Sequence, residues 1–155
     1  MNGAEARLKE LGVELPQVPA PLAQYVPAKL VGDLAMTSGQ VPSCEGGFLH
    51  TGKVGAGVTL EEGRACARLC AINALAAIRA VIGSLDRVAE VVSLRGFVSS
   101  APDFYQQPEV VNGASELMVE VFGEAGKHVR SAVGVCPLPR DVPVELEVVV
   151  RVTPD

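Results

Sequence analysis

The fold is decided largely by one stretch in the last quarter of the chain, Arg130-Ser-Ala-Val-Gly-Val-Cys-Pro-Leu-Pro-Arg-Asp-Val-Pro-Val-Glu145. It predicts a short strand, a tight turn bounded by prolines, and a longer strand that carries a carboxylate. Arg130 lies at the mouth of the first strand, and Glu145 lies on the second, which we expect to be its neighbour. An arginine and a glutamate placed in this way predict a small pocket for an anionic substrate.

The remaining strands are predicted by alternation and by turn residues. Residues 30–38 predict a hairpin that turns at Gly32 and Asp33, and Val88 to Ser99 predicts a valine-rich strand. From Val142 to Val152 the alternation is strict, so one face of this strand should be buried. The members of that face are Val142, Val144, Leu146, Val148, Val150 and Val152.

Three helices are expected. Residues 3–12 predict a short amphipathic helix, and the capping box of residues 59–62 begins a helix that runs to about Ile82. A third helix should be capped near Asp103, with Pro108 in its first turn. We expect residues 42–58 to form a loop. Gly113 within the third helix indicates either close packing or a pocket.

This order of elements, ββ-α-β-α-ββ, predicts an α+β sandwich with a mostly antiparallel sheet and two helices on one face. We expect residues 1–155 to form a single domain, in which residues 1–24 are a short helix and a proline-rich arm. The other face of the sheet is left to solvent or to another subunit. A mean hydropathy of +0.31 favours some apolar surface being buried between subunits.

The amino-acid composition limits the classes of partner that we expect for this protein. A net charge of −5 with no basic run argues against a nucleic-acid binder. The longest apolar stretch is broken by Asn73 and Arg79 and falls short of the ~20 residues of a membrane span, so no membrane partner is expected. The charged N-terminus has no apolar signal core, which predicts a cytoplasmic protein.

The cysteines do not form a recognisable metal motif. Cys66 and Cys70 are one helical turn apart, no CxxC occurs, and neither His50 nor His128 has ligand spacing to a cysteine pair. We therefore expect reduced thiols that pack as small apolar residues, with Cys136 in the core, and no metal or other cofactor.

Several segments together resemble the RidA/YjgF family, over the range from about Tyr25 to Val152. The segments are Thr37-Ser-Gly-Gln-Val-Pro42, the helix that contains Asn73, Phe97-Val with Asp103-Phe104, Val111-Asn112, and Arg130-Ser-Ala-Val through Leu138-Pro139 to Val144-Glu145. The resemblance implies a chorismate-mutase-like fold and a homotrimer with three clefts between subunits. It also implies metal-free hydrolytic deamination of enamines and imines such as 2-aminoacrylate, which gives 2-keto acids and ammonia.

The resemblance also assigns roles. It implies that Arg130 grips the substrate carboxylate and that Glu145 positions the attacking water. The residues that correspond to the family's cleft-lining positions are Tyr25, Ser38, Gly39, Phe104 and Asn112. Backbone amides near Ala132 can add donors.

The chain also departs from the family's usual pattern. A cysteine is often found where Ala132 stands, an acidic residue is common at Gly134, and the segment from Phe104 to Asn112 is longer than in short members. These departures indicate a divergent branch.

Each assignment has a simpler alternative. Arg130 is also explained as a solvated charge at a strand end, and Glu145 as part of an ordinary polar face. Tyr25 is explained equally well by packing against the loop, and Asn112 by exposure on its helix. His128 fits the rim of a pocket better than a general base.

Asn73 is expected to be a buried residue whose hydrogen bonds organise packing. A non-catalytic trimeric module that binds small carboxylates or a protein partner is the alternative function. An RNA-cleaving protein would need a basic groove, which the sequence does not predict.

Overall fold

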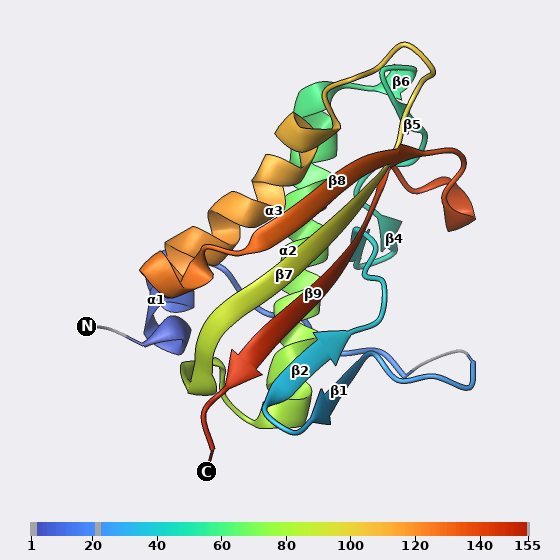
Figure 1. Ribbon diagram of the computed structural model, residues 1–155. Helices are drawn as coiled ribbons and strands as arrows, with labels where there is room; N and C mark the ends of the chain where they lie inside the picture. The colour runs from blue at the N-terminus through green and yellow to red at the C-terminus, as the bar shows by residue number, and fades with distance from the viewer. Residues whose placement is uncertain (1–2, 21–22, 155) are drawn as a thin grey trace.

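The protein is described by a computed structural model over residues 3–20 and 23–154, in which a five-stranded sheet packs against a layer of helices (Figure 1). The strand order is β1-β2-β9-β7-β8. The strands are β1 (Ala28–Val31), β2 (Leu34–Thr37), β7 (Val88–Ser99), β8 (Val129–Val135) and β9 (Val144–Val152). All neighbours pair antiparallel except β7 and β8, which are parallel. The predicted, mostly antiparallel sheet is confirmed.

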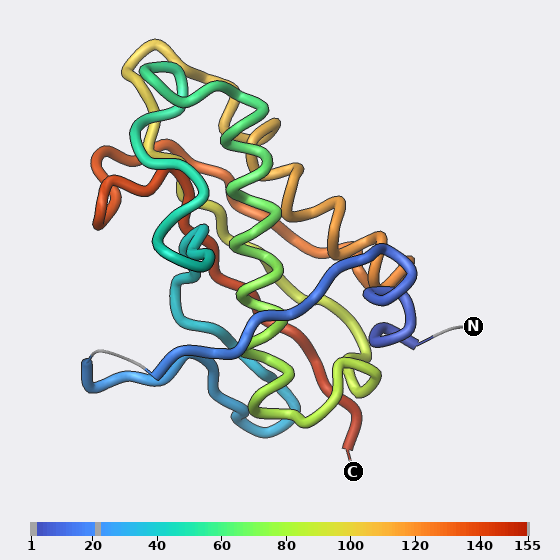
Figure 2. Tube along the Cα trace, turned by 180° about the vertical axis from the view of Figure 1, so that it is seen from behind, coloured from blue at the N-terminus to red at the C-terminus, as the bar shows by residue number. Residues whose placement is uncertain are grey.

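The two long helices, α2 (Leu60–Ile82) and α3 (Gln107–Phe122), lie side by side on one face of the sheet, as predicted. Within the described residues, the other face carries no helix (Figure 1). The short helix α1 (Ala4–Glu10) lies at one end of this layer, and the arm that follows it crosses the outer side of α2 (Figure 2). The prediction of two helices on one face is therefore confirmed.

Helix α2 begins at the predicted capping box. Thr59 Oγ1 accepts a hydrogen bond from the amide of Glu62 at 3.2 Å, and Glu62 Oε2 accepts one from the amide of Thr59 at 2.8 Å. The helix ends at Gly83, whose φ of 88° favours glycine. By length and composition α2 could cross a membrane, but 61% of its most apolar window is buried inside the protein, as in a core helix.

Close packing explains the glycine inside α3. A Cβ atom on Gly113 would collide with the backbone carbonyl of Arg64 on α2, so only glycine lets the two helices approach this closely. The helix starts at Gln107 with Gln106, a polar residue near Asp103, at its N-cap, and Pro108 lies in the first turn as predicted. The Gln107 side chain donates to the Phe104 carbonyl at 2.8 Å and thereby holds residues 101–106 as a separate turn.

The alternation predicted for the last strand is confirmed. Val144, Leu146, Val148, Val150 and Val152 are buried under the helices. The intervening residues point to the face that carries no helix.

The segment predicted as a loop contains four two-residue strands, which corrects that prediction. These strands are β3 (Ser43–Cys44), β4 (Gly47–Phe48), β5 (Lys53–Val54) and β6 (Gly57–Val58). Asn73 organises this segment as predicted, because its Nδ2 lies 2.9 Å from the Val41 carbonyl and 3.1 Å from the Ser43 carbonyl. The side chain is buried, so these bonds satisfy a polar group that water cannot reach.

The cysteines divide into two groups. Cys66 and Cys70 are buried and free, as expected of small apolar residues. Burial raises the pKa of the Cys66 thiol to about 11, so this thiol stays protonated at neutral pH. Cys136 is exposed, because it begins the turn just beyond the end of β8. The prediction that it lies in the core is wrong.

Candidate functional site

Arg130 lies on β8, an edge strand of the sheet, and is paired in register with Leu94 of β7. Its Nη1 donates hydrogen bonds to Asn112 Oδ1 at 2.8 Å and to Ser115 Oγ at 3.1 Å. Within the described part of the chain, no carboxylate lies within ion-pair distance of this exposed guanidinium. The arginines Arg7, Arg64, Arg68, Arg79, Arg95 and Arg151 each contact a carboxylate.

Arg130 is held by helix α3 and by the residues just before β8. Asn112 and Ser115 are three residues apart on α3 and therefore share a face of that helix. Ser115 Oγ also lies 2.9 Å from His128 Nε2, and His128 Nδ1 lies 2.6 Å from the Gly126 carbonyl oxygen. We call Asn112, Ser115, His128 and Arg130 the arginine cluster. Ser115 was not predicted from the sequence, although its spacing from Asn112 is a signal that could have revealed it.

Glu145 lies on β9, opposite Phe97 of β7, on the face without helices. Its carboxylate is half-buried and has no hydrogen-bond partner within the described residues. Burial, and to a lesser extent the charge of Glu147, raises the pKa of Glu145. Glu147 differs, because it pairs with Arg95 at 3.5 Å. Glu147 therefore fits an ordinary polar face, whereas Glu145 is a base without a structural partner.

The segment that follows β2 packs directly against Glu145. A Cβ atom on Gly39 would collide with the Glu145 carboxylate, so the glycine makes room for that side chain. Ser38 Oγ donates to the Val26 carbonyl at 2.6 Å, and Gln40 exchanges two backbone hydrogen bonds with Leu146 of β9. We call Ser38, Gly39 and Glu145 the glutamate cluster.

The two clusters do not meet within one protomer, which corrects the predicted pairing of their strands. Strand β7 lies between β8 and β9 in the sheet. The segment that connects β8 to β9 along the chain therefore passes over the end of β7. Arg130 is in register with Leu94 and Glu145 with Phe97, three residues further along β7. An odd separation puts the two side chains on opposite faces, and strand spacing puts their Cα atoms roughly 14 Å apart.

The other predicted residues divide between these regions. Tyr25 is 55% exposed and lies just before β1, next to the residue that accepts the hydrogen bond of Ser38. Ala132 is half-buried two residues beyond Arg130, so it shares the helix-facing side of β8. Phe104 packs over Gly55 and the core. The structure gives it no contact with Arg130 or Glu145.

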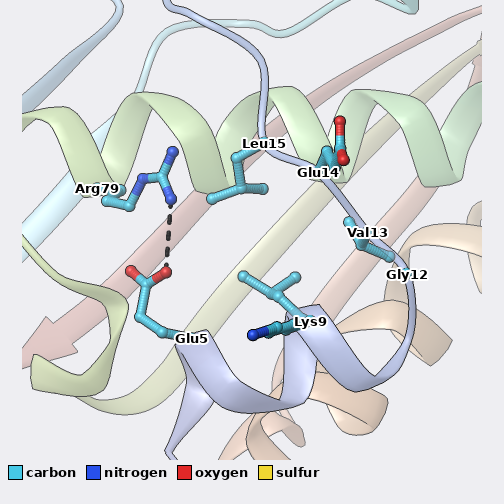
Figure 3. A pocket seen from close by; sticks show the side chains of 8 residues that line it. Glu5, Lys9, Gly12, Val13, Glu14, Leu15 and Arg79 are labelled. Carbon is cyan, nitrogen blue, oxygen red and sulfur yellow. Dashed lines mark hydrogen bonds and ion pairs between the residues drawn. The ribbon is translucent and has the colours of Figure 1, made fainter.

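Two hollows on the described surface contain neither Arg130 nor Glu145. One, of about 470 Å³, lies between α1, the arm and α2, and its charged residues include Glu5 and Arg79, which pair at 3.4 Å (Figure 3). The other, of about 390 Å³, is lined by residues of β7 and β8 and by His128. His128 is thus the member of the arginine cluster that lines one of these two hollows.

Comparison with known proteins identifies the family to which this fold belongs. Residues 5–145 match the sequence profile described as "YjgF/chorismate mutase-like, putative endoribonuclease". The chain belongs to the YjgF/chorismate mutase-like family. Its fold is therefore the chorismate-mutase-like fold that the resemblance implied.

Relatives extend over nearly the whole chain. Protein TCP17 of Trypanosoma cruzi is 44% identical over 94% of this chain and 92% of its own length. The crystal structure of Atu1372 from Agrobacterium tumefaciens superposes with a TM-score of 0.90 at 42% identity, covering 97% of this chain and 92% of that protein. TdcF of Escherichia coli K12, named a "putative reactive intermediate deaminase", is 30% identical over 88% of this chain and 93% of its own length.

Proposed function

We propose that this protein is a metal-free hydrolytic deaminase of small 2-imino acids, and the name of its relative TdcF, putative reactive intermediate deaminase, supports this. The supporting observation is a pair of opposite charges that have no ionic partner among residues 3–20 and 23–154: Arg130 on the edge strand and Glu145 on the helix-free face. Side chains of the same types on the same sheet, Arg95 and Glu147, pair with each other instead.

The proposed site forms between copies of the chain. One copy supplies the arginine cluster at its sheet edge, and the next supplies the glutamate cluster on its open face. An open sheet face with exposed apolar residues is suited to such an interface, and Met36, Val129 and Val133 are 37%, 70% and 44% exposed there. A ring of three copies would hold three such sites, which is the homotrimer that the resemblance implies.

The chemistry needs little beyond these two groups. The Arg130 guanidinium binds the substrate carboxylate through parallel hydrogen bonds and fixes its orientation. Glu145 takes a proton from water as the water oxygen bonds to the C=N carbon, whose π electrons move to nitrogen. Glu145 then returns that proton to the nitrogen, which gives a carbinolamine. Glu145 next takes the proton of the new hydroxyl and delivers it to the nitrogen as the C–N bond breaks and the C=O bond forms, so that ammonia and a 2-keto acid leave. A raised pKa makes this carboxylate a stronger base and suits it to both transfers.

One solved neighbour supports a small ligand that carries a carboxylate. A crystal structure of TdcF, which shares this fold with a TM-score of 0.64 at 24% identity, contains bound serine, an amino acid with a free carboxylate. The family description also mentions an endoribonuclease. The net charge of −5 and the ion-paired arginines favour a small molecule over a polyanionic backbone.

The direct test is keto-acid release from 2-iminobutanoate that is generated in the assay from threonine by a dehydratase. Wild-type protein should accelerate release, and Arg130→Ala should lower kcat/KM by about 10²- to 10³-fold, because a charge-assisted bidentate contact is lost. Arg68→Ala, which removes an ion-paired arginine from the helix layer, is the matched control and should retain the wild-type rate.

Equal rates for wild type and Arg130→Ala would refute the deaminase. If wild type bound 2-oxobutanoate but released no extra keto acid, the protein would be the carboxylate-binding module instead.

A further inference from the structure

We propose that Ser115 and His128 are positioning residues that orient Arg130, so that one particular edge of its guanidinium receives the substrate carboxylate. This inference rests on the proposed function for its ligand but not for its geometry. Neither side chain needs to touch the substrate, because both act through Arg130. Ser115 lies on α3 and His128 lies just before β8, so the contact joins a helix to the edge strand.

With a neutral His128 ring, the hydrogen bonds of this group have one consistent direction. The Gly126 carbonyl can only accept, so His128 Nδ1 carries the hydrogen and donates across 2.6 Å. In the neutral ring His128 Nε2 is then an acceptor, and the Ser115 hydroxyl donates to it across 2.9 Å. The Ser115 oxygen keeps a lone pair for Arg130 Nη1 at 3.1 Å. Donation therefore runs from Arg130 through Ser115 and His128 to the backbone.

The far end of this chain of bonds is fixed to helix α3. A Cβ atom on Gly126 would collide with the Met118 carbonyl, so Gly126 packs directly on the backbone of α3. Gly126 is buried, and its carbonyl gives His128 a rigid partner. Both ends of this chain of hydrogen bonds are thus fixed to α3, the helix that carries Asn112 and Ser115.

The consequence for Arg130 follows from counting hydrogens. The Nη1 nitrogen carries two hydrogens, and it donates one to Asn112 Oδ1 and the other to Ser115 Oγ. The edge formed by Nε and Nη2 has no acceptor among the described residues, and its two parallel N–H bonds match the two oxygens of a carboxylate. We infer that the substrate carboxylate binds side-on at this edge. Without Ser115 or His128 the guanidinium would rotate among several orientations.

The test compares Ser115→Ala, His128→Phe and Ser115→Thr, with His50→Phe as the matched histidine control. Calorimetry should show that the two disruptive variants bind 2-oxobutanoate about tenfold more weakly, because a hydrogen bond to a charged group is lost. In the deaminase assay KM should rise by a similar factor while kcat changes less. Ser115→Thr keeps the hydroxyl and should restore wild-type affinity.

Nitrogen NMR of the free protein tests the geometry without any ligand. Wild type should show His128 with hydrogen on Nδ1 and slow rotation of the Arg130 guanidinium, and Ser115→Ala should speed that rotation. Hydrogen on Nε2 of His128, or unchanged Arg130 rotation and 2-oxobutanoate affinity in both disruptive variants, would overturn the inference. If the NMR results hold while wild type releases no keto acid, the proposed function fails and the positioning role stands.

Discussion

The arginine cluster and the glutamate cluster hold their charges in opposite ways. Arg130 is exposed at a sheet edge and is oriented by the two hydrogen bonds that it donates to side chains of α3. Glu145 is half-buried, has no hydrogen-bond partner among the described residues, and packs against Gly39. The first arrangement suits a group that must stay charged and keep one orientation. The second suits a group that must gain and lose a proton.

The difference teaches that the proposed substrate-binding group and the proposed base lie on separate surfaces of one protomer. Arg130 and Glu145 face away from each other across β7, so each is only half of the proposed site. The helix layer determines the orientation of the cation, whereas the strand segment after β2 determines the environment of the base. Substitutions in one cluster should therefore change substrate affinity, and substitutions in the other should change the rate of proton transfer.

The largest effect that separates the two clusters is expected for Glu145→Gln. Loss of the base should lower kcat for 2-iminobutanoate hydrolysis by about 10²- to 10³-fold, while the affinity for 2-oxobutanoate changes little. Glu147→Gln, two residues along the same strand, is the control and should keep most of the activity, because Glu147 is already paired with Arg95. If both substitutions reduced kcat equally, Glu145 would have no special role.

An intermediate effect is expected when Gly39 is changed and Glu145 is left in place. The Cβ of Gly39→Ala would displace the Glu145 carboxylate, and kcat should fall about tenfold because the base no longer faces the water correctly. The circular dichroism spectrum should stay that of wild type. Full activity in this variant would mean that the position of Glu145 against the segment after β2 is unimportant.

The smallest effect is a pH-dependent change in stability. Folding raises the pKa of Glu145 by burying it, so the ionised carboxylate costs stability at pH values above its unfolded pKa. Below that pKa both states hold the proton and the cost disappears. Glu145→Gln should therefore raise Tm by about 1–2 °C at pH 7 and leave it unchanged near pH 3.5. A lowered Tm at pH 7 would show that the ionised carboxylate has a stabilising partner.

The local structure could be read from the sequence, because its causes are local. The capping box at Thr59, the alternation of β9 and the valine run of β7 each depend on neighbours along the chain, and each was predicted correctly. The start of α3 was predicted approximately, because Pro108 marks the first turn but several polar residues before it could serve as the cap, and Gln106 rather than Asp103 takes that place.

The geometry of the site could be predicted only in part. Its two charged residues were identified from their positions on strands, but the order of the strands depends on contacts distant in sequence. The proline-bounded turn after Arg130 suggested neighbouring strands, whereas in the sheet it passes over β7. Ser115 and His128 were missed as partners of Arg130, because only the packing of α3 beside β8 brings them together.

The most direct test of a site shared between copies is to mix two inactive variants. Arg130→Ala and Glu145→Gln should each be inactive alone. After subunit exchange, one quarter of the sites should combine an intact arginine from one copy with an intact glutamate from the next, so about a quarter of the wild-type rate should return. If the mixture stayed inactive although mass spectrometry showed mixed oligomers, Arg130 and Glu145 would not belong to one site formed between copies.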